Sequence, residues 1–393
     1  MNDPIVIVGA ARTPMGAFQG DFSSVSANEL GAVAIRAAVE RAGLDPALVD
    51  EVLFGNCLMA GQGQAPARQA AIKAGIPVSA GAVTLSKMCG SAMKATMIAF
   101  DSIVAGSNDI VVSGGMESMT NAPYLIPKAR GGYRIGHAMM YDHMMLDGLE
   151  DAYDKGRSMG TFAEECSAKY GFTREEQDNF AIESVKRAQA ATADGSFKWE
   201  IAPVTVSGRS GDVVIDQDEG PLKAKIDKIS KLKPAFQKDG TITAASSSSI
   251  NDGASALVVM RESKAKELGL TPIARILGHA THSQEPSWFT TAPIGAMQKL
   301  TKKIGWSLND VDLFEINEAF ATVPMAAMKE LDIPHRKVNI HGGACALGHP
   351  IGSSGARIIV TLIGALKKTG GKRGIATLCI GGGEGTAVAI EMV

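Results

Sequence analysis

The segment LSKMCGSAMKA, residues 85–95, carries a single cysteine, Cys89, where a pattern typical of a buried strand gives way to a helical one. Unpaired N–H groups and the helix dipole at such a helix start favour an anion. They would therefore draw a thiol with an ordinary pKa of ~8.5 toward its thiolate. A thiolate there could act as a nucleophile, and Gly90 leaves room for a substrate. The position alone leaves open the alternative that Cys89 is a small buried apolar side chain.

A histidine and another cysteine stand in two glycine-rich segments near the end of the chain. His349 lies between Gly348 and Pro350, just before a helical pattern. There it could take a proton from a thiol or donate a hydrogen bond to an oxyanion; a structural turn histidine is the alternative. Cys379 ends a buried-strand pattern and precedes three glycines, whose N–H groups could point at an oxygen while the thiol moves a proton. A phosphate loop is the rival interpretation, but no Gly-Lys-Ser/Thr follows these glycines.

A fourth candidate is NEAFA, residues 317–321, which also follows a strand-like stretch. Asn317 and Glu318 could hold a water or a catalytic group, or Asn317 could simply cap a helix. Two cysteines, a histidine and an asparagine thus all fall at strand ends or helix starts. Ligands of α/β proteins bind at such places, so the four segments together predict one site.

Two long segments of the chain resemble each other, residues 89–118 and residues 351–386. Each has a Gly-Ser start, an apolar helical stretch, a glycine break, an apolar strand and a glycine-rich end. A duplicated α/β half is the economical explanation, and the predicted site then lies at the seam between the two halves.

Apolar stretches of strand length alternate with longer helical patterns, which is typical of α/β architecture with parallel strands. We expect one half in residues 1–120, completed by about 250–270, and the other in residues 271–393. Residues 121–249 are richer in turns and interrupt this alternation, so they are predicted to form an inserted loop domain.

Three elements allow more specific predictions. GAVTLS, residues 81–86, has the composition of a buried strand. The helix predicted over residues 89–106 is apolar on nearly all sides, so we expect protein to cover every face of it. Thr173 and Glu176 have the spacing of a capping box and predict the start of a surface helix.

Composition and charge narrow the classes of function. The chain has 393 residues, 45% of them hydrophobic and 20% charged, with a net charge of −2 and no basic run, so neither nucleic acid nor an acidic membrane surface is an expected partner. The five cysteines are scattered and odd in number, which favours free thiols in a reducing compartment. No signal-like or membrane-length apolar segment is visible, so we expect a cytoplasmic protein.

These motifs, taken together, resemble the thiolase family, and most closely its biosynthetic type. The resemblance extends over essentially the whole chain and rests on MCGSAMKA, GGMESM, INDGASA, NEAFA, GGACALGHPIGSSGAR and CIGGGEGTA, which occur in the family's order. It implies a thiolase fold: two βαβαβαββ halves stacked in five layers, with an inserted loop domain, usually in a homotetramer that is a dimer of dimers. It also implies reversible Claisen condensation of two acetyl-CoA molecules to acetoacetyl-CoA and CoA.

The resemblance assigns catalytic roles residue by residue. Cys89 would be the nucleophile that carries the acyl group, and His349 the base that activates it. Cys379 would remove the α-proton of the second acetyl-CoA. Asn317 would hold a water that stabilises the enolate oxygen together with His349. The N–H groups of Cys89 and Gly381 would bind the oxyanion of the tetrahedral intermediate. No metal and no redox cofactor are implied, since the CoA thioesters are themselves the substrates.

The resemblance also implies contacts with CoA and with the acyl group. Ser248, in the serine-rich segment before residue 250, would touch the pantetheine arm, although the sequence alone favours a flexible loop there. The remaining candidates are Leu149, Met159, Phe289, Ala319 and Phe320. The Met- and His-rich stretch before Leu149 could suggest copper, but a lid over CoA is the better interpretation.

Three positions depart from the family pattern: Ser158 stands where a histidine is frequent, Phe289 where methionine is common in bacteria, and Glu384 where an apolar residue is usual. Phe289 should reshape the acyl pocket, so a 3-ketoacyl-CoA thiolase of broader chain length or 2-methyl preference is the alternative function. Two other functions are disfavoured. A β-ketoacyl carrier-protein synthase would pair its cysteine with two histidines, whereas the second catalytic group here is Cys379. A non-catalytic protein of this fold should lack a catalytic residue, and none is missing. The sequence does not explain Glu384 and leaves the physiological direction open.

Overall fold

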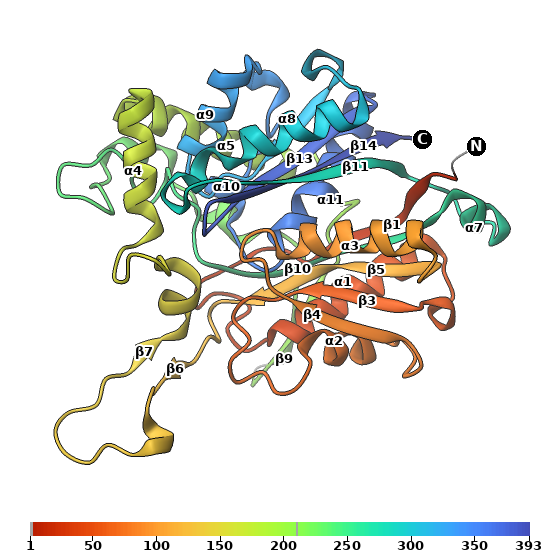
Figure 1. Ribbon diagram of the computed structural model, residues 1–393, viewed down its shortest axis with the longest axis horizontal. Helices are drawn as coiled ribbons and strands as arrows, with labels where there is room; N and C mark the ends of the chain where they lie inside the picture. The colour runs from red at the N-terminus through yellow and green to blue at the C-terminus, as the bar shows by residue number, and fades with distance from the viewer. Residues whose placement is uncertain (1–2, 210) are drawn as a thin grey trace.

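Two lobes of similar construction form the body of the protein (Figure 1). The computed structural model describes residues 3–209 and 211–393. The first lobe contains β1 (Ile5–Arg12), β2 (Gly16–Ala17), α1 (Ala27–Ala42), β3 (Glu51–Gly55), α2 (Pro66–Ala74), β4 (Gly81–Leu85), α3 (Ser91–Ala105), β5 (Ile110–Ser118), β10 (Asn251–Arg261) and α7 (Glu262–Glu267). The second lobe contains β11 (Ala274–Ser283), the 3₁₀ turn η5 (Pro286–Thr291), α8 (Ala292–Ile304), β12 (Leu313–Ile316), α9 (Thr322–Leu331), α10 (Ala344–Leu347), α11 (Ser354–Thr369), β13 (Arg373–Ile380) and β14 (Glu384–Met392).

The segment between β5 and β10 is built differently from the lobes. It contains β6 (Tyr124–Leu125), β7 (Tyr141–Asp142), the π-helical turn η3 (Met145–Leu149), α4 (Met159–Tyr170), α5 (Arg174–Ala193), β8 (Val204–Gly208), β9 (Gly211–Ile215), α6 (Glu219–Lys223) and the 3₁₀ segment η4 (Ile226–Lys231). Its two small hairpins, β6–β7 and β8–β9, do not join the main sheet. Shorter 3₁₀ turns lie at Pro46–Leu48, Ala129–Gly131, Leu308–Asp310 and His335–Lys337.

The elements are stacked in five layers, as the predicted α/β class requires (Figure 1). Helices α1 and α2 cover the outer face of the first sheet, whose strands run in the order β4-β3-β5-β10-β1. Helices α3 and α11 form the middle layer. The second sheet, in the order β11-β14-β13-β12, follows, and α8 covers its outer face. The sequence therefore predicted the fold class correctly.

The two sheets are joined by hydrogen bonds. Strands β1 and β11 pair over three residues each, from Ile5↔Ile276 to Ile7↔Ala274. The sheets are mixed rather than wholly parallel: β3–β4, β3–β5 and β12–β13 pair in parallel, and the other strands of the two sheets pair antiparallel. In the second lobe the counterpart of β4 shrinks to a single bridge between Phe314 and Val338.

The apolar composition of α11 explains why this helix lies in the middle layer. Every residue of α11 from Ser354 to Leu366 is buried, because this helix packs against α3 and against both sheets. A helix that is apolar on all sides needs such a location. The N-terminal ends of α3 and α11 lie against each other, since a Cβ on Gly355 would lie 2.4 Å from the backbone N of Met93.

Two sequence predictions were wrong for the single chain. Strand β4 is not buried: it lies at the edge of the first sheet, and Val83 is 43% exposed. Helix α3 is not covered on every face either, since Ile98 is 36% and Val104 54% exposed. The composition of both elements was interpreted correctly as apolar, but residues 3–209 and 211–393 do not cover the exposed face of β4 or of α3.

The inserted segment is held to the first lobe by a buried ionic cluster. Arg12 of β1 donates to Glu200 (Nε–Oε1, 2.6 Å) and to Asp218 (Nη1–Oδ1, 2.6 Å), and all three side chains are inaccessible to water. In the same segment α5 begins at the predicted capping box, in which Thr173 Oγ1 accepts from the N–H of Glu176. Within residues 3–209 and 211–393, no helix combines the length and apolarity needed to cross a bilayer.

Candidate active site

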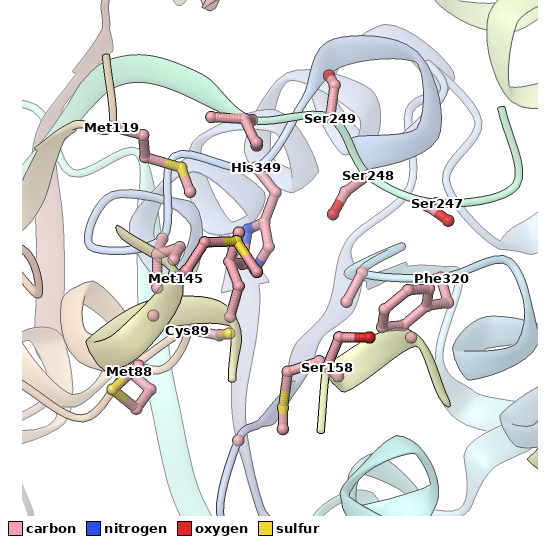
Figure 2. Close-up of a pocket in the computed structure, with 18 of the residues that line it drawn as sticks. Met88, Cys89, Met119, Met145, Ser158, Ser247, Ser248, Ser249, Phe320 and His349 are labelled. Carbon is pink, nitrogen blue, oxygen red and sulfur yellow. The ribbon is translucent and has the colours of Figure 1, made fainter. Parts of the chain in front are cut away.

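A cavity of about 300 Å³ opens at the seam, at the carboxyl ends of β4, β12 and β13 (Figure 2). Its lining comes from both lobes and from the inserted segment, and it is predominantly apolar. Of the eleven residues that the sequence singled out, nine line it: Cys89, Leu149, Met159, Ser248, Phe289, Ala319, Phe320, His349 and Gly381. Segments up to 292 residues apart (from Cys89 to Gly381) thus converge on one space.

Cys89 lies in a tightly constrained turn between β4 and α3. Met88 before it adopts a left-handed backbone, with φ of 46°, which is unusual for a residue with a side chain. The hydroxyl of Ser91 secures the turn, because it accepts from Lys87 N (2.8 Å) and donates to Met88 O (2.6 Å). A Cβ on Gly90 would lie 2.4 Å from Cδ1 of Ile380, so any side chain there would force Ile380 to move.

Two opposing effects act on the pKa of the Cys89 thiol. Burial raises the pKa of its thiol to about 11, whereas the N–H groups of Gly381 and of Cys89 itself point at the sulfur and lower the pKa. At neutral pH the group is therefore a thiol that needs a base. The same two N–H groups are positioned to receive an oxyanion that forms beside the sulfur.

His349 is positioned as a neutral base. Its Nδ1 lies 2.6 Å from Ser354 Oγ, which in turn lies 2.9 Å from the carbonyl of Pro350. A carbonyl only accepts, so the hydroxyl proton belongs to that bond and Nδ1 must donate to Ser354. Burial, assisted by the charge of Arg357, lowers the pKa of His349 to about 3. The unprotonated nitrogen is then Nε2, which has no hydrogen-bond partner among the described residues.

The backbone of His349 is fixed by Asn251 and by a glycine. The N–H of His349 donates to Asn251 Oδ1 (3.2 Å). Gly348 has φ of 98°, and a Cβ on it would lie 2.0 Å from the same oxygen. Only glycine therefore allows this turn beside β10, where Asn251 begins the strand.

Asn317 is buried behind the cavity and does not line it. Its Oδ1 faces Arg357 Nη2 at 3.4 Å, and because a guanidinium only donates, this contact fixes the orientation of the amide. The Asn317 Nδ2 is then left without a partner among the described residues, as a group that holds a water would be. The alternative of a helix cap was wrong, since α9 begins five residues later, at Thr322.

Glu318, in contrast, has a structural role. Its carboxylate accepts from Asn339 Nδ2 (2.8 Å), Ser184 Oγ (2.7 Å) and Cys345 N (3.0 Å). These contacts tie β12 to α5 and α10.

Cys379 is the next-to-last residue of β13 and is completely buried, outside the lining of the cavity. Burial raises the pKa of its thiol well above the ordinary value, and repulsion from the Cys89 sulfur, when that sulfur is ionised, raises it further. The two sulfurs are thus within electrostatic reach of each other. A thiol with so high a pKa becomes a strong base once it has lost its proton.

A buried carboxyl group, Glu117 at the end of β5, links the two lobes behind Cys89. It accepts from Asn56 Nδ2 (2.6 Å), Leu58 N (3.0 Å) and Gly352 N (2.9 Å). The last contact secures the loop that carries His349. Burial raises the pKa of Glu117 to about 7, even though these donors lower it.

The serine-rich loop, residues 246–249, borders the side of the cavity that faces Cys89 (Figure 2). Ser247 donates to Thr243 O (2.8 Å) and Ser249 donates to Asn251 Oδ1 (2.7 Å). Ser248 also lines the cavity, but its hydroxyl bonds to no described residue and is free to meet a ligand. The backbone of this serine is fixed, since its N–H donates to Ala319 O (2.9 Å).

In the Met-rich loop, both ring nitrogens of His143 have partners within the chain. His143 contacts Asp147 through Nδ1 (2.6 Å) and accepts from Ala60 N through Nε2 (3.3 Å). No group of three or more histidine, cysteine, aspartate or glutamate side chains with metal-binding geometry occurs in residues 3–209 and 211–393. The neighbouring Met145 and Leu149 line the cavity instead.

Comparison with known proteins identifies the family. The model of the thiolase N-terminal domain matches residues 5–263, and that of the thiolase C-terminal domain matches residues 270–392. The chain therefore belongs to the thiolase family, as its motifs suggested.

Individual relatives are similar over their whole length. Acetyl-CoA acetyltransferase 2 of Arabidopsis thaliana is 51% identical over 392 residues, which cover 99% of this chain and 97% of the relative. Acetyl-CoA acetyltransferase of Cupriavidus necator is 49% identical over 389 residues, which cover 98% of this chain and 99% of the relative. The crystal structure of the Bacillus anthracis acetyl-CoA acetyltransferase superposes with a TM-score of 0.96 at 42% identity, covering 100% and 99% of the two chains. The crystal structure of an Ascaris suum thiolase in complex with coenzyme A superposes with a TM-score of 0.94 at 42% identity, covering 99% of this chain and 100% of that one.

Several residues of the site escaped the sequence analysis. Ser354, Arg357 and Glu117 lie within the motifs GGACALGHPIGSSGAR and GGMESM, but only their contacts reveal what they hold. A buried arginine or glutamate among apolar neighbours is a usable signal, because such a charge needs a partner. Ser158, which the sequence marked as a departure from the family pattern, also lines the cavity, and its hydroxyl makes no hydrogen bond to a described residue.

Proposed function

We propose that this thiolase is an acetyl-CoA C-acetyltransferase, which condenses two acetyl-CoA molecules to acetoacetyl-CoA and CoA and also runs in reverse. One observation carries the proposal: a cysteine sulfur that receives two backbone N–H groups shares a cavity with a neutral histidine whose Nε2 is free. The full-length similarity to acetyl-CoA acetyltransferases of a plant and a bacterium favours this substrate over longer or 2-methyl-branched 3-ketoacyl-CoA.

In the first half-reaction His349 Nε2 takes the proton of Cys89, and the sulfur attacks the thioester carbonyl of acetyl-CoA. The N–H groups of Cys89 and Gly381 hold the oxyanion of the tetrahedral intermediate. When the intermediate collapses, the departing CoA sulfur takes a proton from Cys379. The enzyme is then S-acetylated on Cys89, with an imidazolium at His349 and a thiolate at Cys379.

In the second half-reaction the Cys379 thiolate removes an α-proton from another acetyl-CoA. Once acetylated, Cys89 can no longer ionise, which removes one of the causes that raise the Cys379 pKa. The protonated Nε2 of His349 and a water held by Asn317 Nδ2 stabilise the enolate oxygen. The enolate carbon attacks the acetyl group, and the released Cys89 sulfur recovers its proton from His349, which restores all three groups.

The substrates bring their own reactive thioesters, so the scheme needs neither a metal nor a redox cofactor. CoA would enter along the serine-rich loop, where the Ser248 hydroxyl is free for the pantetheine arm. Leu149 and Met159 would cover it, and Phe289 and Phe320 would bound the acyl end. The apolar lining supports this arrangement, because it excludes water from the developing charges.

We also propose a cytoplasmic homotetramer. The five cysteines are free thiols, which supports a reducing compartment. The exposed edge strand β4 and the exposed apolar face of α3 support one subunit contact, since an unpaired apolar edge invites a partner. The β6–β7 hairpin projects from the body (Figure 1) and carries exposed Ile126, Ile135 and Met139, which supports a second contact. Sedimentation equilibrium should give four chains per particle; a monomer would contradict this assembly.

Steady-state kinetics test the function. The enzyme should cleave acetoacetyl-CoA with CoA by a ping-pong mechanism, and kcat/KM should fall for longer 3-ketoacyl homologues. Substitution of serine for Cys89 should abolish turnover while the thermal unfolding temperature stays near that of the wild type. A folded wild-type protein without turnover would contradict the proposal, and a preference for longer or branched substrates would replace its substrate.

A further inference from the structure

The two N–H groups that would hold the oxyanion belong to different lobes. That of Cys89 comes from the turn between β4 and α3, and that of Gly381 from the turn between β13 and β14. Their spacing is therefore not fixed by any single element. The second turn is also built of glycines, and Gly382 and Gly383 both have positive φ, 96° and 88°. Glycine makes such a turn possible but gives it no rigidity of its own.

An ion pair connects these two turns directly. Lys87, two residues before Cys89, contacts Oε2 of Glu384, three residues after Gly381. The other carboxylate oxygen, Oε1, accepts from Ser283 Oγ at the end of β11 (3.1 Å). Both charged side chains are mostly shielded from water, with 20% of Lys87 and 31% of Glu384 exposed. This pair also gives Glu384, which the sequence left unexplained, a definite contact.

The backbone on each side would transmit the effect of this contact. In the first turn Lys87 N and O are both hydrogen-bonded, to Ser91 Oγ (2.8 Å) and from Gly90 N (3.0 Å). In the second, Glu384 pairs with Ile380 across the hairpin, so it brackets Gly381. A shift of either charged residue must therefore move an N–H group of the predicted oxyanion hole.

We infer that Lys87 and Glu384 are positioning residues that clamp the lobes at the distance the oxyanion hole requires; this inference rests on the proposed function. An exposed ion pair would contribute little. This pair differs because it is shielded, is oriented by Ser283, and joins chain segments 297 residues apart. It does not line the cavity, so its loss should affect kcat rather than the KM for acetyl-CoA.

The kinetic test uses Lys87→Met, Glu384→Gln and the double variant. Each single change should lower kcat about tenfold, because small displacements of catalytic groups are costly, with KM changed less than about twofold. The double variant should lose no more than either single one, since the pair acts as a unit. Lys87→Arg should retain most activity. Additive losses, or an unchanged kcat in folded protein, would overturn the inference.

Glu262→Gln is the matched control. Glu262 pairs with Arg275 (2.6 Å) at similar exposure, but near the end of β11 that is remote from Ser283. It should lose stability comparable to Glu384→Gln but keep its kcat. An equal fall in kcat for the control would show a general structural effect and overturn the clamp.

The pKa of Cys89 provides a readout that does not depend on turnover. Direct electrostatics predicts that Glu384→Gln, which removes a negative charge, lowers the Cys89 pKa. A loosened clamp predicts the opposite, because the Gly381 N–H no longer stabilises the thiolate. We expect the pH profile of iodoacetamide alkylation to shift upward; a downward shift or none would overturn the clamp. If wild type shows no turnover, the proposed function fails, whereas the alkylation profile still tests the clamp.

Discussion

Replacing Ser354 by alanine should slow acetylation of Cys89 by disturbing a single proton position. In the native site the Nδ1–H of His349 donates to Ser354 Oγ at 2.6 Å, which leaves Nε2 free to take the Cys89 proton. Without the hydroxyl, a buried Nδ1–H loses its partner, at a cost of about 1–3 kcal/mol. The proton can avoid this cost by moving to Nε2, where it blocks the base.

A bias of that size corresponds to about a 5- to 150-fold lower rate, since 1.36 kcal/mol is a factor of ten. The assay is the single-turnover burst of CoA released from acetyl-CoA, which reports acetylation of Cys89 separately from condensation. The expected result for Ser354→Ala is a slower burst of full amplitude, because the nucleophile and the cavity remain.

Ser353→Ala is the matched control. Ser353 is equally buried and its hydroxyl contact is with Ser255 Oγ at 2.9 Å, so the alanine variant loses that contact but no hydrogen bond to His349. If both variants slow the burst equally, or if neither does while both stay folded, the assignment of the His349 tautomer is wrong.

Three further predictions concern other parts of the site. Arg357→Lys should slow exchange of the α-protons of acetyl-CoA about 100-fold, because it frees the amide of Asn317; Cys89 acetylation should change far less, and equal losses in both reactions would contradict this role. In the absence of substrate, the alkylation rate of Cys89 should rise about tenfold per pH unit between pH 7 and 10, because a pKa raised to about 11 keeps the thiol protonated there; a plateau below pH 9 would refute it. Phe289→Met should change the ratio of kcat/KM for acetoacetyl-CoA and its 2-methyl analogue by about tenfold, since Phe289 is 3% exposed and lines the cavity; an unchanged ratio would reject a role in acyl selection.

The sequence predicted the fold class because α/β architecture depends on local patterns. Alternating apolar runs and helical periods, and the recurrence of one pattern in residues 89–118 and 351–386, do not require knowledge of distant contacts. The exposure of β4 and of α3 could not be predicted in the same way. Apolar composition shows that a face needs cover, but not whether the cover comes from the same chain.

The site could be predicted to the extent that its residues occupy strand ends and helix starts. Nine of the eleven chosen residues line one cavity, whereas Asn317 and Cys379 are buried behind it. The supporting contacts were not predictable. The roles of Ser354, Arg357 and the Lys87–Glu384 pair depend on which segments the tertiary structure brings into contact. Residue type reveals which groups can do chemistry, and the tertiary structure reveals which nitrogen carries the proton.

The most direct test of the central claim is a search for the covalent intermediate. The protein is mixed with acetyl-CoA, quenched in acid and digested, and the peptides are examined by mass spectrometry. The account predicts one acetyl group on the peptide that contains Cys89, and its disappearance on addition of CoA. An acetyl group on Cys379 alone, or no acetylated cysteine while acetoacetyl-CoA is still formed, would contradict it.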